Sequence, residues 1–204
     1  MTFSSFPIDP NAILVADASV VINLNATGRA EDIIQAHPGS IVLTDAAFAE
    51  LAAGANKGHN DHEQVQVLVD SGAMRQVSLG ESGLRVYASL IEGSALKTLD
   101  DGEAATIGYA HEVGGVAIID ERKARTICEK AFPGLSIAST VDMLTHSLVE
   151  EALGRQGQIK AVTNALRGAR MRVPPHQVEL VVDLIGEEVA ATCNSLPRAA
   201  RMAR

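Results

Sequence analysis

The sequence predicts an α/β fold: a three-layer α/β/α sandwich around a central, mostly parallel, five-stranded sheet. Short apolar runs alternate with longer helical patterns, which is typical of parallel strands joined by crossover helices. The first and fourth runs, AILVA and VAII, are almost purely apolar, as expected of central strands covered on both faces. Hydrophobic residues make up 47% of the chain but aromatics only 3%, so the core must consist of Ala, Val, Leu and Ile.

Each apolar run predicts one strand. These runs are AILVA, IVLT, MRQVSL, VAII and LSIAS, at 12–16, 41–44, 74–79, 116–119 and 135–139. The longer segments between them predict helices near 29–36, 45–55, 60–71, 81–92, 102–113 and 121–131. Two more helices are expected near 140–153 and 157–170.

The C-terminal part is expected to be a separate unit, because Pro174 and Pro175 stop any helix. The segment PHQVELVVDLIGEEVAATCNSL predicts a separate amphipathic helix with Pro at its start. The basic tail PRAARMAR is expected to fray. We predict a main domain over 1–153 and a C-terminal helical extension with a basic tail over 154–204.

Charge and cysteine usage restrict the class of protein. A net charge of −8 argues against a large non-specific contact with phosphate, although a nuclease with a metal-filled acidic cluster stays possible. Cys128 and Cys193 lie far apart in the sequence and are expected to be buried free thiols of a reduced compartment. The N-terminus lacks signal-peptide features, and no apolar run is long enough for a bilayer. We therefore expect a cytoplasmic protein with no membrane partner.

Acidic residues follow the two most apolar strands. Asp17 ends AILVAD and Asp120 ends VAIID, and in an open parallel sheet ligands bind beyond the carboxyl ends of the strands. The alternative is that each aspartate only caps the helix that follows it. Asp100 and Glu103 fit a capping box in the same way, but a cap does not explain the doubled acid at Asp100 and Asp101.

Glu50 is a further candidate because apolar residues surround it in TDAAFAEL. A carboxylate next to a buried face is costly unless it is paired or binds a metal. The alternative is a partly exposed glutamate on the flank of a helix.

Four segments together resemble the motifs of PIN-domain ribonucleases, in that family's order: ILVADASVVINL, TDAAFAEL, LDDGEAATIGYA and VAIIDERKAR. The third resembles the branch with a DxGEA motif. The resemblance implies a catalytic set of Asp17, Glu50, Glu103 and Asp120, with Ser19 orienting the first aspartate. It leaves open whether Glu103 or Asp101 touches the metal. Small members of the family are often VapC-type toxins, which implies a homodimer and a small antitoxin partner.

This set of acids supports metal-dependent hydrolysis of RNA. Several carboxylates within a few ångströms need a cation, and hard oxygen ligands favour Mg²⁺ or Mn²⁺. Metal ligands are expected among Asp17, Asp120, Glu103 and Asp101, and a metal-bound water can attack a phosphodiester. Arg122, Lys123 and Arg125 follow Asp120 and are candidates for binding the RNA phosphates, or simply form a solvated helix face.

Two other functions remain open. One is a phosphoryl-transfer enzyme of the phosphatase or receiver type, although Ser19 stands where a second aspartate would be expected. The other is a PIN-like fold that has lost catalysis and binds nucleic acid or protein.

Overall fold

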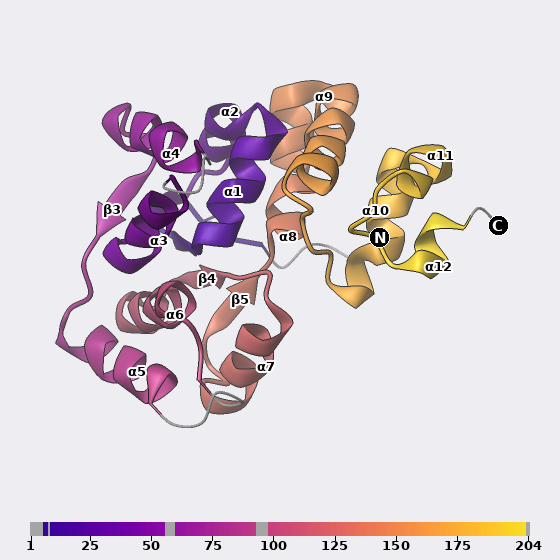
Figure 1. The fold of residues 1–204 in the computed structure, drawn as a ribbon. Coiled ribbons are helices and arrows are strands. Elements are labelled where there is room, and N and C mark those ends of the chain that lie inside the picture. Colours follow the sequence, from indigo (N-terminus) through magenta and orange to yellow (C-terminus); the bar gives the residue numbers. More distant parts are fainter. Residues whose placement is uncertain (1–5, 8, 56–59, 93–97, 203–204) are drawn as a thin grey trace.

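The computed structural model describes residues 6–7, 9–55, 60–92 and 98–202. Its centre is a five-stranded parallel sheet in the order β3-β2-β1-β4-β5 (Figure 1). The strands are β1 (Ile13–Ala16), β2 (Ser40–Thr44), β3 (Arg75–Val77), β4 (Val116–Ile118) and β5 (Ser136–Ala138). Each coincides with one of the predicted apolar runs, so the predicted fold class is confirmed.

The strand order reverses beside β1. The chain runs outward from β1 to β2 and β3, and then returns to place β4 on the other side of β1. β1 and β4 pair in parallel register, with Leu14 opposite Val116 and Ala16 opposite Ile118. The carboxyl ends of these two strands therefore lie side by side at the reversal, where sheets of this kind bind their ligands.

Helices cover both faces of the sheet and continue beyond it. Up to β4 they are α1 (Ala18–Thr27), α2 (Ala30–Ala36), α3 (Asp45–Ala55), α4 (Asp61–Asp70), α5 (Glu81–Ile91) and α6 (Asp101–Val113). After β4 come α7 (Arg122–Ala131), α8 (Thr140–Leu144) and α9 (Ser147–Gly168). The C-terminal part adds a short 3₁₀ turn (Pro175–Gln177), α10 (Val178–Ile185), α11 (Glu187–Ala191) and α12 (Arg198–Arg201).

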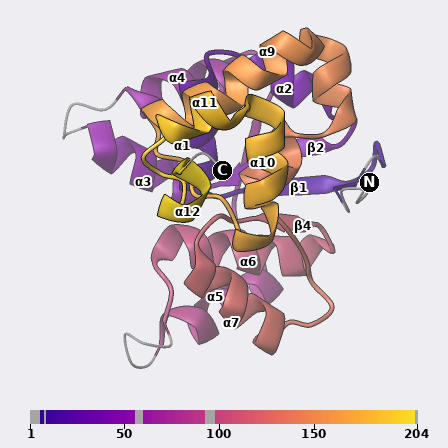
Figure 2. The same ribbon diagram turned by 90° about the vertical axis from the view of Figure 1, so that its right-hand side faces the viewer.

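The three layers follow from the alternation of side chains along each strand. In β1, Leu14 belongs to a hydrophobic cluster that continues through α1, α2 and α9. Leu24 of α1 is fully buried in this cluster. Val15 belongs to the opposite cluster, with Ile107 of α6 and Ala124 of α7. Figures 1 and 2 show α5, α6 and α7 on one side of the sheet and α1, α2 and α9 on the other.

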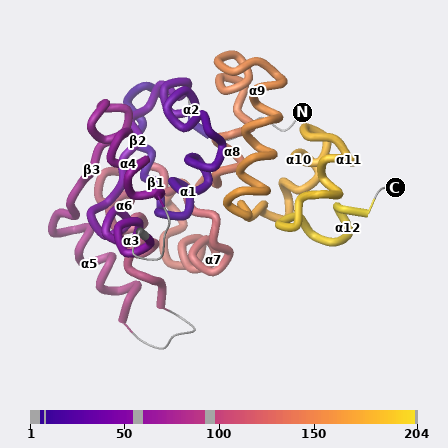
Figure 3. The backbone as a smooth tube through the Cα atoms, turned by 45° about the horizontal axis from the view of Figure 1, so that its top comes forward, coloured from indigo at the N-terminus to yellow at the C-terminus, as the bar shows by residue number. Residues whose placement is uncertain are grey.

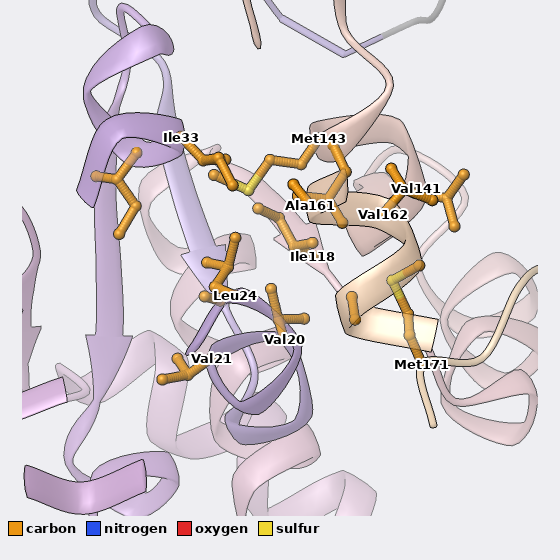
Figure 4. Close-up of a cluster of buried hydrophobic side chains, with 14 of the residues drawn as sticks. Val20, Val21, Leu24, Ile33, Ile118, Val141, Met143, Ala161, Val162 and Met171 are labelled. Carbon is orange, nitrogen blue, oxygen red and sulfur yellow. The ribbon is translucent and has the colours of Figure 1, made fainter. Parts of the chain in front are cut away.

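The C-terminal helices α10, α11 and α12 group beside α9, away from the sheet (Figure 3). They nevertheless share the first hydrophobic cluster, to which Val181, Ala190 and Leu196 belong. Figure 4 shows Met171, which follows α9, in the same cluster as Val20 of α1.

The helices after β5 differ from the predicted ones. The first predicted helix, near 140–153, is divided, because α8 ends at Leu144 and α9 begins at Ser147, whereas the predicted boundary between 153 and 157 is confirmed. A break lies inside α9 at Gly154, whose φ of 70° and ψ of 158° are open only to glycine.

The single helix predicted after Pro175 is wrong as well. Gly186, with φ 85° and ψ 150°, separates α10 from α11. The tail does not fray throughout, because Arg198–Arg201 form one helical turn, and residues 203–204 lie outside the described part. Both cysteines are buried and free, as predicted. No described helix combines the length and apolarity needed to cross a membrane.

Candidate active site

Asp17 lies between β1 and α1, and its two carboxylate oxygens have different surroundings. It is the N-cap of α1, and its Oδ2 accepts hydrogen bonds from the Ser19 hydroxyl at 2.7 Å and the Ser19 backbone N–H at 3.3 Å. Its Oδ1 is buried and has no hydrogen-bond partner among the described residues. A buried carboxylate oxygen without a donor is costly, so this atom is available to bind a cation.

Asp120 follows β4, lines the same pocket and is oriented by three hydrogen bonds. Its Oδ1 accepts from the Thr140 backbone N–H at 2.8 Å, and its Oδ2 accepts from the Thr140 hydroxyl at 2.6 Å and Asn23 Nδ2 at 2.8 Å. The N-cap of α7 is Glu121, so Asp120 does not cap that helix. The Asp120 carboxylate instead joins β4 to the start of α8 and to α1.

The acidic start of α6 divides into three environments. Asp100 is the N-cap and accepts from the Glu103 N–H at 3.0 Å, as the capping interpretation predicted. Glu103, one turn into the helix, is buried and lines a pocket with Asp17 and Asp120. Asp101 is exposed and accepts a hydrogen bond from the Tyr87 hydroxyl at 2.6 Å. The structure therefore brings Glu103, and not Asp101, to this pocket.

Gly102 is required by the close approach of α3 to α6. A Cβ at this position would overlap Oε2 of Glu50 and lie 3.4 Å from Asp17 Oδ1. Only glycine therefore lets the Glu50 carboxylate lie across the first turn of α6.

The pocket has a volume of about 290 Å³ and lies at the carboxyl ends of β1 and β4. The acids that line it are Asp17, Glu50, Asp100, Glu103, Asp120 and Glu121. All four acids predicted as the catalytic set are thus brought together from four different parts of the chain.

Burial raises the pKa values of the pocket acids, and neighbouring carboxylates add to the effect at Asp17, Glu50 and Glu103. Burial raises the pKa of Asp17 to about 6, with a smaller contribution from the charge of Asp100. Burial and neighbouring acids raise the pKa values of Glu50 and Glu103 to about 7. Burial also raises the pKa of Asp120, against the hydrogen bonds from Thr140. The pocket therefore concentrates negative charge that a cation would stabilise.

The donor atoms suit a hard divalent cation. The unpartnered Asp17 Oδ1 and the neighbouring carboxylates offer oxygen ligands, which Mg²⁺ and Mn²⁺ prefer. Within the described part of the chain, no three acids, histidines or cysteines are placed so that together they could hold a metal ion directly. Mg²⁺ commonly binds through one or two carboxylates and keeps several waters, so its chemistry does not need such a group.

The three cations predicted to bind phosphate have different surroundings. Arg125 donates to the carbonyls of Ile119 at 3.1 Å and Ala138 at 2.9 Å, so its guanidinium ties together the ends of β4 and β5. Lys123 Nζ donates to the Thr98 carbonyl at 2.5 Å. Arg122 is exposed and lines a neighbouring cleft.

Several residues of the pocket were not predicted. Asn23 lies one turn after Ser19 on the same face of α1, so its spacing indicates that it lies near the pocket. The spacing does not indicate that Asn23 contacts Asp120. Asp100 was predicted only as a cap, and the doubled acid was the signal of a second role. Arg170 and Arg172 also line the pocket, and nothing in the sequence placed them there.

Comparison with known proteins agrees with this geometry. A search of curated proteins finds no match to the chain. A family model described as a PIN domain matches residues 13–187, which includes all five strands, the residues of the acidic pocket and the chain as far as the end of α10. PIN domains are generally nucleases that bind nucleic acid and use divalent metals. Because the match covers far more than half of its length, the chain belongs to the PIN-domain family.

Proposed function

We propose that this protein is a ribonuclease that hydrolyses phosphodiester bonds of RNA with Mg²⁺ or Mn²⁺. The observation that carries the proposal is the unpartnered Oδ1 of Asp17, buried in a pocket where Glu50, Glu103 and Asp120 also converge. Neither a helix cap nor a structural hydrogen-bond network needs that atom to be left without a donor.

The chain's own residues prepare the pocket. Ser19 holds one oxygen of Asp17 and leaves the other free, and Asn23 and Thr140 fix the orientation of Asp120. Asp17, Asp120 and Glu103 would hold the metal ion, partly through its bound waters, and Glu50 would orient a water beside it. When bound, the ion makes a water more acidic and offsets the charge that develops on the phosphate. Arg122 and Lys123 would attract the RNA phosphates.

The resemblance to VapC-type proteins extends the proposal to biological role. We infer a toxin of a toxin–antitoxin pair that acts in the cytoplasm, as a homodimer held inactive by a small antitoxin protein. Co-expression with the product of the neighbouring open reading frame tests this role: growth arrest by the chain alone, relieved by its neighbour, is expected. Unaffected growth on expression of the active chain would contradict it.

Cleavage of a labelled single-stranded RNA tests the enzymatic proposal. We expect cleavage with Mg²⁺ or Mn²⁺, none with EDTA, and a loss of at least about 10²-fold in Asp17→Asn. Asp183→Asn, which removes an exposed acid of α10, is the matched control and should cleave like the wild type. RNA binding without cleavage in the wild type would favour the non-catalytic binding module instead. Equal activity of Asp17→Asn would refute the role of that residue.

A further inference from the structure

Arg170 has an unusual backbone conformation for its residue type. It follows the last turn of α9 with φ 54°, and among the described residues it alone is a non-glycine with positive φ. The Met171 N–H donates back to the Ala165 carbonyl at 3.1 Å, which fixes the chain at this bend. Glycine occupies such positions without steric cost and is the usual residue after a helix.

The Arg170 side chain is not explained by the fold. It is exposed, lines the acidic pocket, and has no hydrogen bond or ion pair with any residue that the structure describes. The adjacent Met171, by contrast, is fully buried and anchors the bend in the core. The core thus holds the backbone in place, and the cation at 170 is directed to the rim of the pocket.

A second cleft, of about 360 Å³, adjoins the acidic pocket, and Asp120 and Arg172 line both. One wall is α7, and the other is formed by residues 172–176, 195 and 197 of the C-terminal part. The basic side chains along it are Arg122, Arg125, Arg172 and His176, and the acids are Asp120 and Glu129. Arg172 also forms an ion pair with Glu121, which joins the two walls at the point where the cavities meet.

A polyanionic strand is the occupant that this arrangement fits. The whole chain carries a net charge of −8 and the pocket is acidic, so a phosphodiester backbone needs local positive charge to approach. Arg122 of the cleft and Arg170 of the acidic pocket supply it, and Val173 and Pro175 add apolar surface for unpaired bases and sugars. A single strand can lie along such a walled groove with its bases unstacked.

We propose that residues 170–176 form the second wall of a groove for single-stranded RNA, in which Arg170 binds a phosphate beside the acidic pocket. The proposal rests on the proposed ribonuclease function and gives the C-terminal part a direct role in holding the substrate. Residues 170–176 lie beyond the predicted main domain of 1–153, so substrate binding on this view needs both parts of the chain.

Fluorescence anisotropy with a labelled single-stranded RNA in EDTA, at several salt concentrations, tests the groove without any catalysis. Arg170→Gly removes the cation and relieves the left-handed strain, so its melting temperature should equal or exceed that of the wild type. Its affinity should fall roughly tenfold at low salt, and the slope of log affinity against log salt should shrink by about 0.7, the value for one phosphate contact.

Three further variants separate the effect of charge from those of shape and position. Arg170→Lys keeps the charge and should retain most of the affinity. Arg75→Gln removes an exposed arginine of β3, at the far edge of the sheet, and should bind like the wild type, whereas Arg170→Gln should not.

The groove proposal would be overturned if Arg170→Gly bound single-stranded RNA with wild-type affinity. Tighter binding of a duplex than of a single strand would also overturn it. So would an absence of RNA binding by the wild type at low salt. Cleavage with Mg²⁺ is measured separately: if the wild type binds through Arg170 but does not cleave, the ribonuclease proposal fails and the groove stands. If it cleaves and Arg170→Gly binds and cleaves equally, only the groove fails.

Discussion

At the scale of single residues, the acids of the pocket are not equivalent. Asp120 is held by three hydrogen bonds, whereas Asp17 keeps one oxygen without a partner. Glu103 and Glu50 have pKa values near 7, because burial and the neighbouring carboxylates disfavour their charged forms. Removing a charge therefore has different consequences at different positions of the same pocket.

Glu103→Gln is expected to stabilise the metal-free protein at neutral pH. The pKa of Glu103 rises from its ordinary 4.5 to about 7 on folding, so between these pH values the folded state binds more protons than the unfolded chain. Its contribution to the free energy of unfolding is therefore present below pH 4.5 and lost as the pH rises to 7. Glutamine does not titrate, so Glu103→Gln does not lose stability in this way as the pH rises. RNA cleavage by Glu103→Gln should fall by orders of magnitude, because the variant lacks the carboxylate.

Urea denaturation in EDTA at pH 4.5, 6 and 7.5 measures this difference. The stability advantage of Glu103→Gln over the wild type should grow with pH, and Mg²⁺ at pH 7.5 should narrow it by stabilising the wild type. An advantage that is constant across the three pH values would contradict the assigned titration.

Gly102→Ala should lower activity without weakening the fold. The new Cβ would overlap the end of the Glu50 side chain, which must then move out of place. Alanine is a better helix former than glycine, so the melting temperature should be unchanged or higher. A displacement of this kind costs on the order of 10²-fold in rate.

Gly54→Ala in α3 is the control for Gly102→Ala, because it makes the same substitution where the new Cβ meets open space. It should leave RNA cleavage close to that of the wild type. Equal activity of Gly102→Ala and Gly54→Ala would show that the position of the Glu50 carboxylate does not matter for cleavage.

At the scale of elements, most strands and helices were predictable because their signals are local. The apolar runs at β1 and β4 identify both strands and, through the residues that follow them, Asp17 and Asp120. The break at Gly154 lies at the predicted boundary between the helices near 140–153 and 157–170, whereas the break at Gly186 was not predicted. Which glycine adopts a positive φ depends on the packing of the two flanking helical segments, and that packing is tertiary.

Gly154→Ala should destabilise the protein by more than about 1 kcal/mol, because φ 70° with ψ 158° is open only to glycine. The same change at Gly54, in a regular helix with open space around it, should be neutral or stabilise by roughly 0.5–1 kcal/mol. Chemical denaturation of both variants measures the contrast. Equal effects would mean that α9 straightens in solution.

At the scale of the whole molecule, the C-terminal extension is bound to the core by apolar contacts. Val181, Ala190 and Leu196 belong to the same hydrophobic cluster as Leu14 of the central strand. The sequence predicted an apolar stripe on this segment but not what covers it, because a stripe shows only that some surface must be buried. The same holds for Arg170 and Arg172, whose place beside the pocket depends on where α9 ends.

Deleting residues 174–204 should therefore lower the melting temperature and cause aggregation. Each buried side chain of this segment contributes roughly 1.5–3 kcal/mol, and the total stability of a domain is only about 5–15 kcal/mol. Thermal melting with light scattering measures both effects. A monodisperse truncated chain that melts like the full chain would show that the segment is a separable tail.

The interleaved origin of the acidic pocket has a consequence for protein synthesis. The pocket draws on Asp17, Glu50, Glu103 and Asp120, on Thr140 to orient the last of them, and on Arg170 at its rim. β1, the first strand to leave the ribosome, pairs with β4 only after about a hundred further residues have been made. A half-translated chain thus has Asp17 and Glu50 but neither Glu103 nor Asp120. On the proposed function, the emerging polypeptide is harmless to its own messenger RNA until translation is nearly complete.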